Sequence, residues 1–167
     1  MPARLLGPLV LLGLGLAADP TFAHVGPDEQ LRDLDARIAT EPMNAGLYLH
    51  RGELLRARGD LLPALRDFEG ARTLDPTSAE PDFHAGRAML EAGLPAEAIG
   101  PLDRALAMRP GHLDARTSRG RARARLGRHA EAAADFTIAI RSYPPGTSPQ
   151  PDLYTAGAPH PNAAPCS

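Results

Sequence analysis

The chain has 167 residues, enough for one domain, and its formal net charge of −2 argues against a dedicated nucleic-acid-binding protein. Lysine and tryptophan are absent and aromatic residues make up 4%, so the core has to be built mainly from Leu, Ala and Met on packed helices. The single cysteine, Cys166, excludes an internal disulfide and a cysteine-based metal site.

Residues 1–23 have the features of a secretory signal peptide. Arg4 supplies the positive charge, and the apolar stretch 5–18 is too short to span a bilayer comfortably. Small residues favour cleavage after Ala23, with Ala18 as the alternative site and an uncleaved membrane anchor as the other interpretation. We therefore expect a periplasmic or secreted protein.

Cleavage after Ala23 would make His24 the new amino terminus. A terminal amine and an imidazole are both donors for copper, so copper binding at His24 is a remote alternative function. No second histidine is spaced to complete such a site, and an ordinary terminus is favoured. We predict no other metal and no cofactor.

A lead-in helix is predicted over residues 28–41. Leu31, Leu34 and Ile38 recur at spacings of three and four and so share one helix face. Pro42 follows this helix in phase with the later prolines described below. The lead-in helix therefore occupies the place of the second helix of a preceding unit, and its larger, charged residues fit a solvated cap.

The central part of the chain repeats one pattern three times, with a period of 34 residues. An internal repeat of this length predicts stacked supersecondary units, here 45–78, 79–112 and 113–146. The recurring positions are Pro42, Pro76, Pro110, Pro144; Gly52, Gly86, Gly120; Gly59, Gly93, Gly127; Ala64, Ala98, Ala132; Phe68, Leu102, Phe136; and Ala71, Ala105, Ala139.

Each unit is predicted to be a helix, a tight turn and a second helix, over 45–58 and 62–74 in the first unit. Gly59 and its equivalents fit a left-handed residue at the end of the first helix. Gly52 and its equivalents are small because the two helices cross closely there. We expect Phe68 and Phe136 to fill the gap between neighbouring units.

Two local features are predicted in the second unit. Thr77 and Glu80 have the spacing of a capping box before its first helix. Pro101 falls inside its second helix, where the missing N–H removes a hydrogen bond, so we predict a kink there.

This pattern resembles the tetratricopeptide repeat over residues 45–146. Three positions depart from it: Asp82 and Arg116 stand where the first unit has Tyr48, and Arg123 stands where it has Leu55. The resemblance implies an all-α fold, an α-solenoid of three helix-turn-helix repeats behind one lead-in helix. It also implies binding of proteins or peptides and seldom catalysis.

The same resemblance implies that the first helices of the units line a concave groove. Leu49, Phe83 and Leu90 are expected to be apolar anchors flanked by arginines, which suits a peptide or protein segment with an acidic or carboxylate group. The pattern lacks the carboxylate clamp of chaperone-binding members, and the alternative is that these are only solvated helix faces. The predicted groove residues are Leu49, Glu53, Arg56, Phe83, Arg87, Leu90, Arg121 and Arg125, with Glu80, Glu91, Asp114 and Thr117 at neighbouring groove positions.

The third unit is rich in arginine between Arg116 and Arg128. The arginines spread around the helix without interleaved aromatics, so solvation of the terminal unit is favoured over an anionic partner such as nucleic acid. No nucleophile motif, phosphate loop or metal-ligand spacing is found, and His50 and His84 should lie about 10 Å apart, too far to share a metal. We therefore do not expect an enzyme.

Residues 147–167 are predicted to be a disordered, proline-rich tail. Without a closing helix, Ile138 and Ile140 of the last helix would partly lack cover. Either this face self-associates, giving a homo-oligomer, or Leu153 and Tyr154 fold back onto it. Cys166 is interpreted as incidental, with an intermolecular disulfide as the alternative. The favoured function is an interaction scaffold, and the alternative is a self-associating assembly factor.

Overall fold

The computed structural model describes residues 26–142. This part of the chain is all-α, without strands, as predicted. Its helices are α1 (Pro27–Thr40), α2 (Ala45–Arg58), α3 (Leu61–Leu74), α4 (Glu80–Glu91), α5 (Pro95–Met108), α6 (Leu113–Arg125) and α7 (His129–Ser142). The predictions about the signal peptide, its cleavage at Ala18 or Ala23, copper at His24, the tail 147–167, Leu153, Tyr154 and Cys166 lie outside the described residues.

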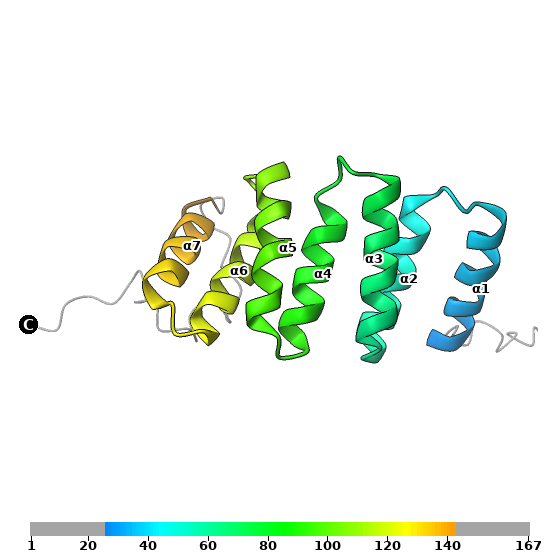
Figure 1. Cartoon of the computed structure of the whole chain (residues 1–167), viewed down its shortest axis with the longest axis horizontal. Helices are drawn as coiled ribbons and strands as arrows, with labels where there is room; N and C mark the ends of the chain where they lie inside the picture. The colour runs from blue at the N-terminus through cyan, green and yellow to red at the C-terminus, as the bar shows by residue number, and fades with distance from the viewer. Residues whose placement is uncertain (1–25, 143–167) are drawn as a thin grey trace, which may run out of the picture.

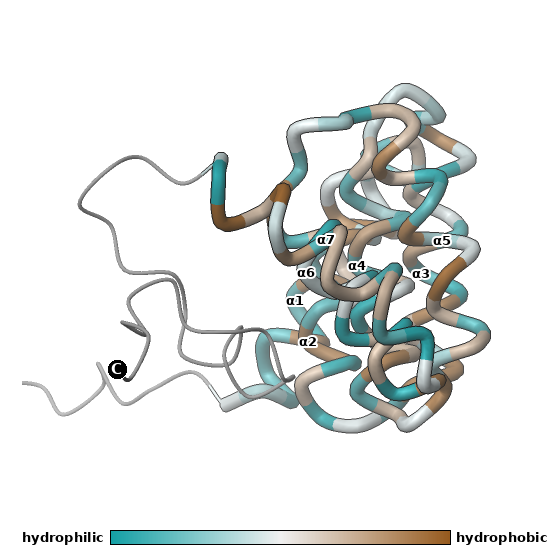
Figure 2. The backbone as a smooth tube through the Cα atoms, turned by 90° about the vertical axis from the view of Figure 1, so that its left-hand side faces the viewer, coloured by the Kyte–Doolittle hydropathy of each residue, from teal (hydrophilic) through white to brown (hydrophobic). Residues whose placement is uncertain are grey.

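The helices stand side by side in one row (Figure 1). Helices α2 and α3, α4 and α5, and α6 and α7 form the three pairs, and α1 packs on α2 ahead of them. The first helices of the pairs also touch one another, α2 with α4 and α4 with α6, whereas the second helices approach each other less closely. The first helices therefore form one continuous side of the solenoid, which we call the A-helix face. Figure 2 shows the row from its end, with apolar and polar residues interspersed along the stacked helices.

A glycine with positive φ separates the two helices of each pair. The φ angles are 90° at Gly59, 79° at Gly93 and 74° at Gly127, which confirms the predicted left-handed residues. At the first turn, Gly59 N–H donates to the Arg56 carbonyl at 2.9 Å and so satisfies one of the last carbonyls of α2.

A second glycine in each pair lies under a large side chain of the partner helix. A Cβ atom on Gly52 would lie 2.6 Å from the Phe68 ring, and one on Gly120 would lie 2.7 Å from the Phe136 ring. The close crossings are therefore confirmed. Phe68 also stacks on His84 of the next unit, with 5.7 Å between ring centroids, and shares a core with Ala88, so it fills the gap between units as predicted. The same expectation is wrong for Phe136, whose core partners belong to its own unit.

The first and third units share a buried ion-pair arrangement. Arg51 of α2 donates to both oxygens of Asp67 on α3, at 2.8 and 2.7 Å, and to Asp35 on α1 at 2.7 Å. One guanidinium thus connects three successive helices. In the third unit Arg119 binds Asp135 and Asp103 in the same way, at 2.6–3.0 Å.

Several arginines of the third unit are consequently structural. Asp135 is 2% exposed and also accepts from Arg123 Nη1 at 2.7 Å, while Arg116 Nη1 lies 3.9 Å from it. The expectation that these arginines mainly solvate the terminal unit is wrong for Arg116, Arg119 and Arg123, whose side chains are largely buried around this carboxylate.

The second unit replaces the buried ion pair with Ala85 and Pro101, which stand one period from Arg51 and Asp67. Pro101 is buried, and α5 continues without interruption through it. The kink at Pro101 stays a prediction. In the second unit an apolar proline thus stands where the other two units have a buried aspartate paired with an arginine.

The predicted capping box is wrong. Thr77 Oγ1 donates to Asp75 Oδ1 at 2.7 Å and makes no bond to α4. Ser78 Oγ instead accepts from Glu80 N–H at 3.3 Å. The Glu80 side chain is committed elsewhere, as described below.

The glycine crossings predict opposite effects for two matched substitutions. In Gly86→Ala the new Cβ would lie 2.5 Å from Leu102 Cγ and 3.2 Å from the Ala98 carbonyl oxygen, so we expect a loss of about 1–3 kcal/mol. At the exposed Gly100, nothing lies nearer than 3.9 Å, and alanine should stabilise α5 by about 1 kcal/mol. Urea unfolding of both variants measures the difference, and equal effects would contradict the close crossing.

The shared ion pair predicts a second contrast. Asp135→Ala leaves buried arginine charge uncompensated and should cost about 3–5 kcal/mol. Asp103→Ala removes the exposed partner of the same Arg119 and should cost no more than about 1 kcal/mol. Chemical denaturation measures the free energy of unfolding of both variants. A similar loss in both would contradict the view that the buried pair with Asp135 contributes more than the exposed pair with Asp103.

Candidate binding face

The predicted groove residues come from the three helices of the A-helix face. Helix α2 carries Leu49, Glu53 and Arg56, helix α4 carries Phe83, Arg87 and Leu90, and helix α6 carries Arg121 and Arg125.

The apolar members of this set are not open anchors. Phe83 is 6% exposed and Leu90 is 4% exposed, and both belong to the core between α4, α5 and α6. His112, at the start of α6, lies against the Phe83 ring with centroids 4.6 Å apart. Leu49 is half-buried against the core around Phe68. The prediction of accessible apolar anchors is therefore wrong for Phe83 and Leu90, because contact between successive first helices buries them.

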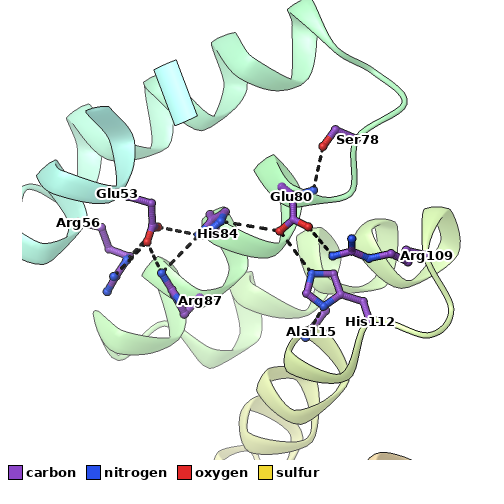
Figure 3. A network of polar contacts seen from close by, with 9 residues as sticks. All are labelled: Glu53, Arg56, Ser78, Glu80, His84, Arg87, Arg109, His112 and Ala115. Atoms are coloured by element: carbon purple, nitrogen blue, oxygen red, sulfur yellow. Dashed lines mark hydrogen bonds and ion pairs between the residues drawn. The ribbon is translucent and has the colours of Figure 1, made fainter. Parts of the chain in front are cut away.

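Charged side chains take the place of these anchors, and Glu53 is at their centre (Figure 3). Its carboxylate accepts from Arg56 Nε at 3.1 Å and from Arg87 Nη2, and it lies 2.7 Å from His84 Nδ1. Partial burial alone would raise its pKa, but hydrogen bonds from His84 and Arg56 outweigh that effect and lower the pKa of Glu53 to about 2. Glu53 therefore stays ionised and connects α2 to α4.

Glu80 forms the second half of the same network (Figure 3). Its carboxylate accepts from Arg109 and lies 3.9 Å from His84 Nε2 and 3.6 Å from His112 Nε2. His112 also caps α6, because its Nδ1 accepts from Ala115 N–H at 3.4 Å. The network thus runs from α2 through α4 to the start of α6.

The arginines of the predicted groove all have partners within the protein. Arg56 Nη1 donates to Glu91 at 2.5 Å, and the Arg87 guanidinium lies 5.3 Å from the centroid of the Phe83 ring. Arg125 Nη1 donates to the Leu90 carbonyl at 2.5 Å, and Arg121 also interacts within the chain. A carboxylate ligand would therefore have to exchange with an existing contact.

A small notch opens beside this network. It has a volume of about 150 Å³ and is lined by Arg56, Gly59, Leu61, Ala88, Glu91 and Ala92. One side is charged and the other is formed by short aliphatic groups.

Sequence reasoning misses both histidines as part of the face. It weighs His84 only as a metal ligand with His50, and it leaves His112 out. The available signal is the proximity of His84 to Glu80 and Arg87 along α4 at spacings of four and three, which brings these side chains together on one helix face.

Neither a metal centre nor a membrane-spanning helix is found in residues 26–142. No three histidine, cysteine or carboxylate side chains there are grouped to hold an ion. No helix in that range is long and apolar enough to cross a bilayer.

Comparison with known proteins supports the fold. Residues 83–147 match the tetratricopeptide repeat family, and no curated protein matches the chain. A crystal structure of MamA is 25% identical, with 71% of this chain and 69% of that chain covered and a TM-score of 0.65. An Arabidopsis OM64 tetratricopeptide repeat domain is 23% identical, with coverage of 67% and 89% and a TM-score of 0.61.

A third similar structure contains a peptide. It is described as the first tetratricopeptide repeat domain of Spaghetti (RPAP3) bound to the HSP90 peptide SRMEEVD; it is 20% identical, covers 67% of this chain and 89% of that chain, and has a TM-score of 0.61. The paired helices, left-handed glycines and nested crossings define an α-helical repeat solenoid. Residues 83–147 carry the sequence pattern of the tetratricopeptide repeat family, and residues 26–142 have the fold of such a solenoid.

The network predicts a pH effect that involves His112. Its burial, together with the nearby Arg109 charge, lowers its pKa, although Glu80 and Asp114 act in the opposite direction. Below the ordinary histidine pKa of about 6.5, His112 binds a proton more readily in the unfolded chain than in the folded protein. The free energy of unfolding is therefore highest above about pH 6.5 and decreases as the pH drops below it.

His112→Asn keeps a helix-capping side chain and removes this titration. Urea midpoints measured at pH 7.5 and 5.5 should fall less for His112→Asn than for the wild type. His129→Asn, at the exposed start of α7, is the control and should behave like the wild type. An unchanged pH dependence in His112→Asn would show that other groups cause it.

Proposed function

We propose that this protein is an interaction scaffold, not an enzyme, and that its A-helix face binds a segment of a partner protein. The observation that carries the proposal is the contact of α2 with α4 and of α4 with α6, which turns three separate helices into one surface. Solenoid repeat proteins use such extended surfaces for binding.

The partner segment is acidic in this proposal. Arg56, Arg87, Arg121 and Arg125 lie on the helices of the A-helix face, and guanidinium groups recognise carboxylates through directed, paired hydrogen bonds. Because the apolar residues Phe83 and Leu90 are buried, recognition would depend more on charge than on apolar anchoring. The RPAP3 domain, which carries the acidic peptide SRMEEVD, supports the view that a fold of this kind can hold such a segment.

We also propose that the protein acts in the periplasm or outside the cell. The support is the signal-like sequence of residues 1–23, with its positive charge, short apolar stretch and small residues.

A second candidate function is self-association through α7. Helix α7 packs on α6, and within residues 26–142 no later helix covers its other side. Ile138 on this helix is 45% exposed. An exposed apolar side chain at the end of a repeat array favours contact with another copy.

Site-specific photo-cross-linking tests the scaffold proposal. A cross-linker placed at Arg125 on α6 or at Glu91 on α4 should capture the same partner protein, whereas one placed at Thr73 on α3 should not. Charge reversal at Arg121 should lower the yield at Arg125. If the cross-linker at Thr73 captured as much protein as those at Arg125 and Glu91, and the three positions captured different proteins, a specific A-helix face would be refuted.

Sedimentation equilibrium tests self-association. If α7 mediates a dimer, the wild type should show a concentration-dependent mass and Ile138→Glu should shift it toward the monomer. Met43→Glu is the control, because Met43 is 78% exposed at the other end of the array. A wild type that remains monomeric throughout would exclude this candidate.

A further inference from the structure

Two arginines of the A-helix face divide their donors between two glutamates that differ in exposure. Glu53 is held by Arg56 Nε at 3.1 Å, Arg56 Nη2 at 3.3 Å and Arg87 Nη2, and its side chain is 25% exposed. Glu91 is 49% exposed and receives only Arg56 Nη1 at 2.5 Å among these donors. Glu53 therefore holds both guanidinium groups, and the more exposed Glu91 binds Arg56 and lies near Arg87.

One donor in this arrangement is incompletely used. Arg87 Nε is buried and has no hydrogen-bond partner. Glu91 Oε1 lies 3.9 Å from it, beyond hydrogen-bond distance. A carboxylate at the place of Glu91, but nearer to Arg87 Nε, could accept from both Arg56 Nη1 and Arg87 Nε, which would satisfy a donor that is now without a partner.

The notch beside Glu91 adds a second requirement. Its volume of about 150 Å³ leaves room for a short aliphatic group, and its apolar wall is formed by Leu61, Ala88 and Ala92. Arg56 and Glu91 both line the notch, so a ligand carboxylate at the place of the Glu91 carboxylate would have room for such a group beside it.

We infer that Glu91 holds the place of a ligand carboxylate, and that the ligand is an acidic side chain of a partner segment followed by a small aliphatic residue. This inference rests on the proposed function of the A-helix face and adds a defined site to it. Arg56 and Arg87 bind the carboxylate, Glu53 positions both arginines, and the notch takes the aliphatic group. The exposed Glu91 leaves when the ligand arrives.

The test compares Glu91→Gln with the wild type, using two probes. The first is sodium butyrate, which carries a carboxylate on a short aliphatic chain. The second is the peptide acetyl-Ala-Glu-Val-Ala-amide, and its Gln analogue is the negative probe. Glu97→Gln is the matched control variant, because Glu97 is an exposed glutamate on α5.

The readout is the NMR signal of the arginine Nε–H groups. In Glu91→Gln, both acidic probes should shift the Arg87 Nε–H signal and bind about two- to five-fold more tightly than to the wild type, as expected from removing one exposed competing carboxylate. Glu97→Gln should match the wild type, the Gln peptide should not bind, and Arg56→Gln should lose binding.

Equal affinity in the wild type and Glu91→Gln, or an Arg87 Nε–H signal that does not respond, would overturn the inference. These measurements need no natural partner, so they are independent of the cross-linking experiment. Probe binding without specific cross-linking would refute the proposed scaffold function and leave the carboxylate site standing. Specific cross-linking without probe binding would refute the site alone.

Discussion

The contact between a glycine on the first helix of each pair and a large side chain on the second sets the geometry of the whole array. Gly52, Gly86 and Gly120 are buried under Phe68, Leu102 and Phe136, at distances that leave no room for a Cβ atom. Because interior packing is dense, an added methyl group at these points has to separate the helices. The relative placement of successive first helices, and so the A-helix face, follows from this crossing.

The three units share these glycine crossings but differ in their hydrogen bonds and ion pairs. Tyr48 donates to the Pro42 carbonyl at 3.0 Å, and Arg116, two periods later, donates to the Pro110 carbonyl at 2.5 Å. Asp82 cannot donate in this way and instead binds Arg104 on α5, at 2.7 and 3.0 Å. Asp82 and Arg116, which depart from the repeat pattern at the position of Tyr48, therefore each find a polar partner nearby.

The sequence was a good guide wherever one residue type meets a local requirement. The turns at Gly59, Gly93 and Gly127 follow from backbone conformation, and the helix limits from apolar spacing, so no tertiary information was needed. The prediction for Phe83 and Leu90 failed because burial there depends on contacts beyond α4. His112 and the core shared with α5 and α6 cover these residues, and the spacing within α4 does not reveal this. The capping prediction failed for a similar reason, since Glu80 binds Arg109, which lies just after the end of α5.

The pairing of charges on the A-helix face has a consequence for selectivity. A face whose arginines already hold Glu53, Glu91 and the Leu90 carbonyl offers little to a ligand that merely carries negative charge, because each new hydrogen bond replaces an existing one. The affinity then depends on how much stronger the ligand's hydrogen bond is than the internal one it displaces, and this difference is small for exposed pairs. Only a ligand that satisfies an unused donor, such as Arg87 Nε, benefits from the exchange. The carboxylates of Glu53 and Glu91 thus lower the affinity for unrelated anions, and they favour a partner whose carboxylate has the geometry to reach the unused donor.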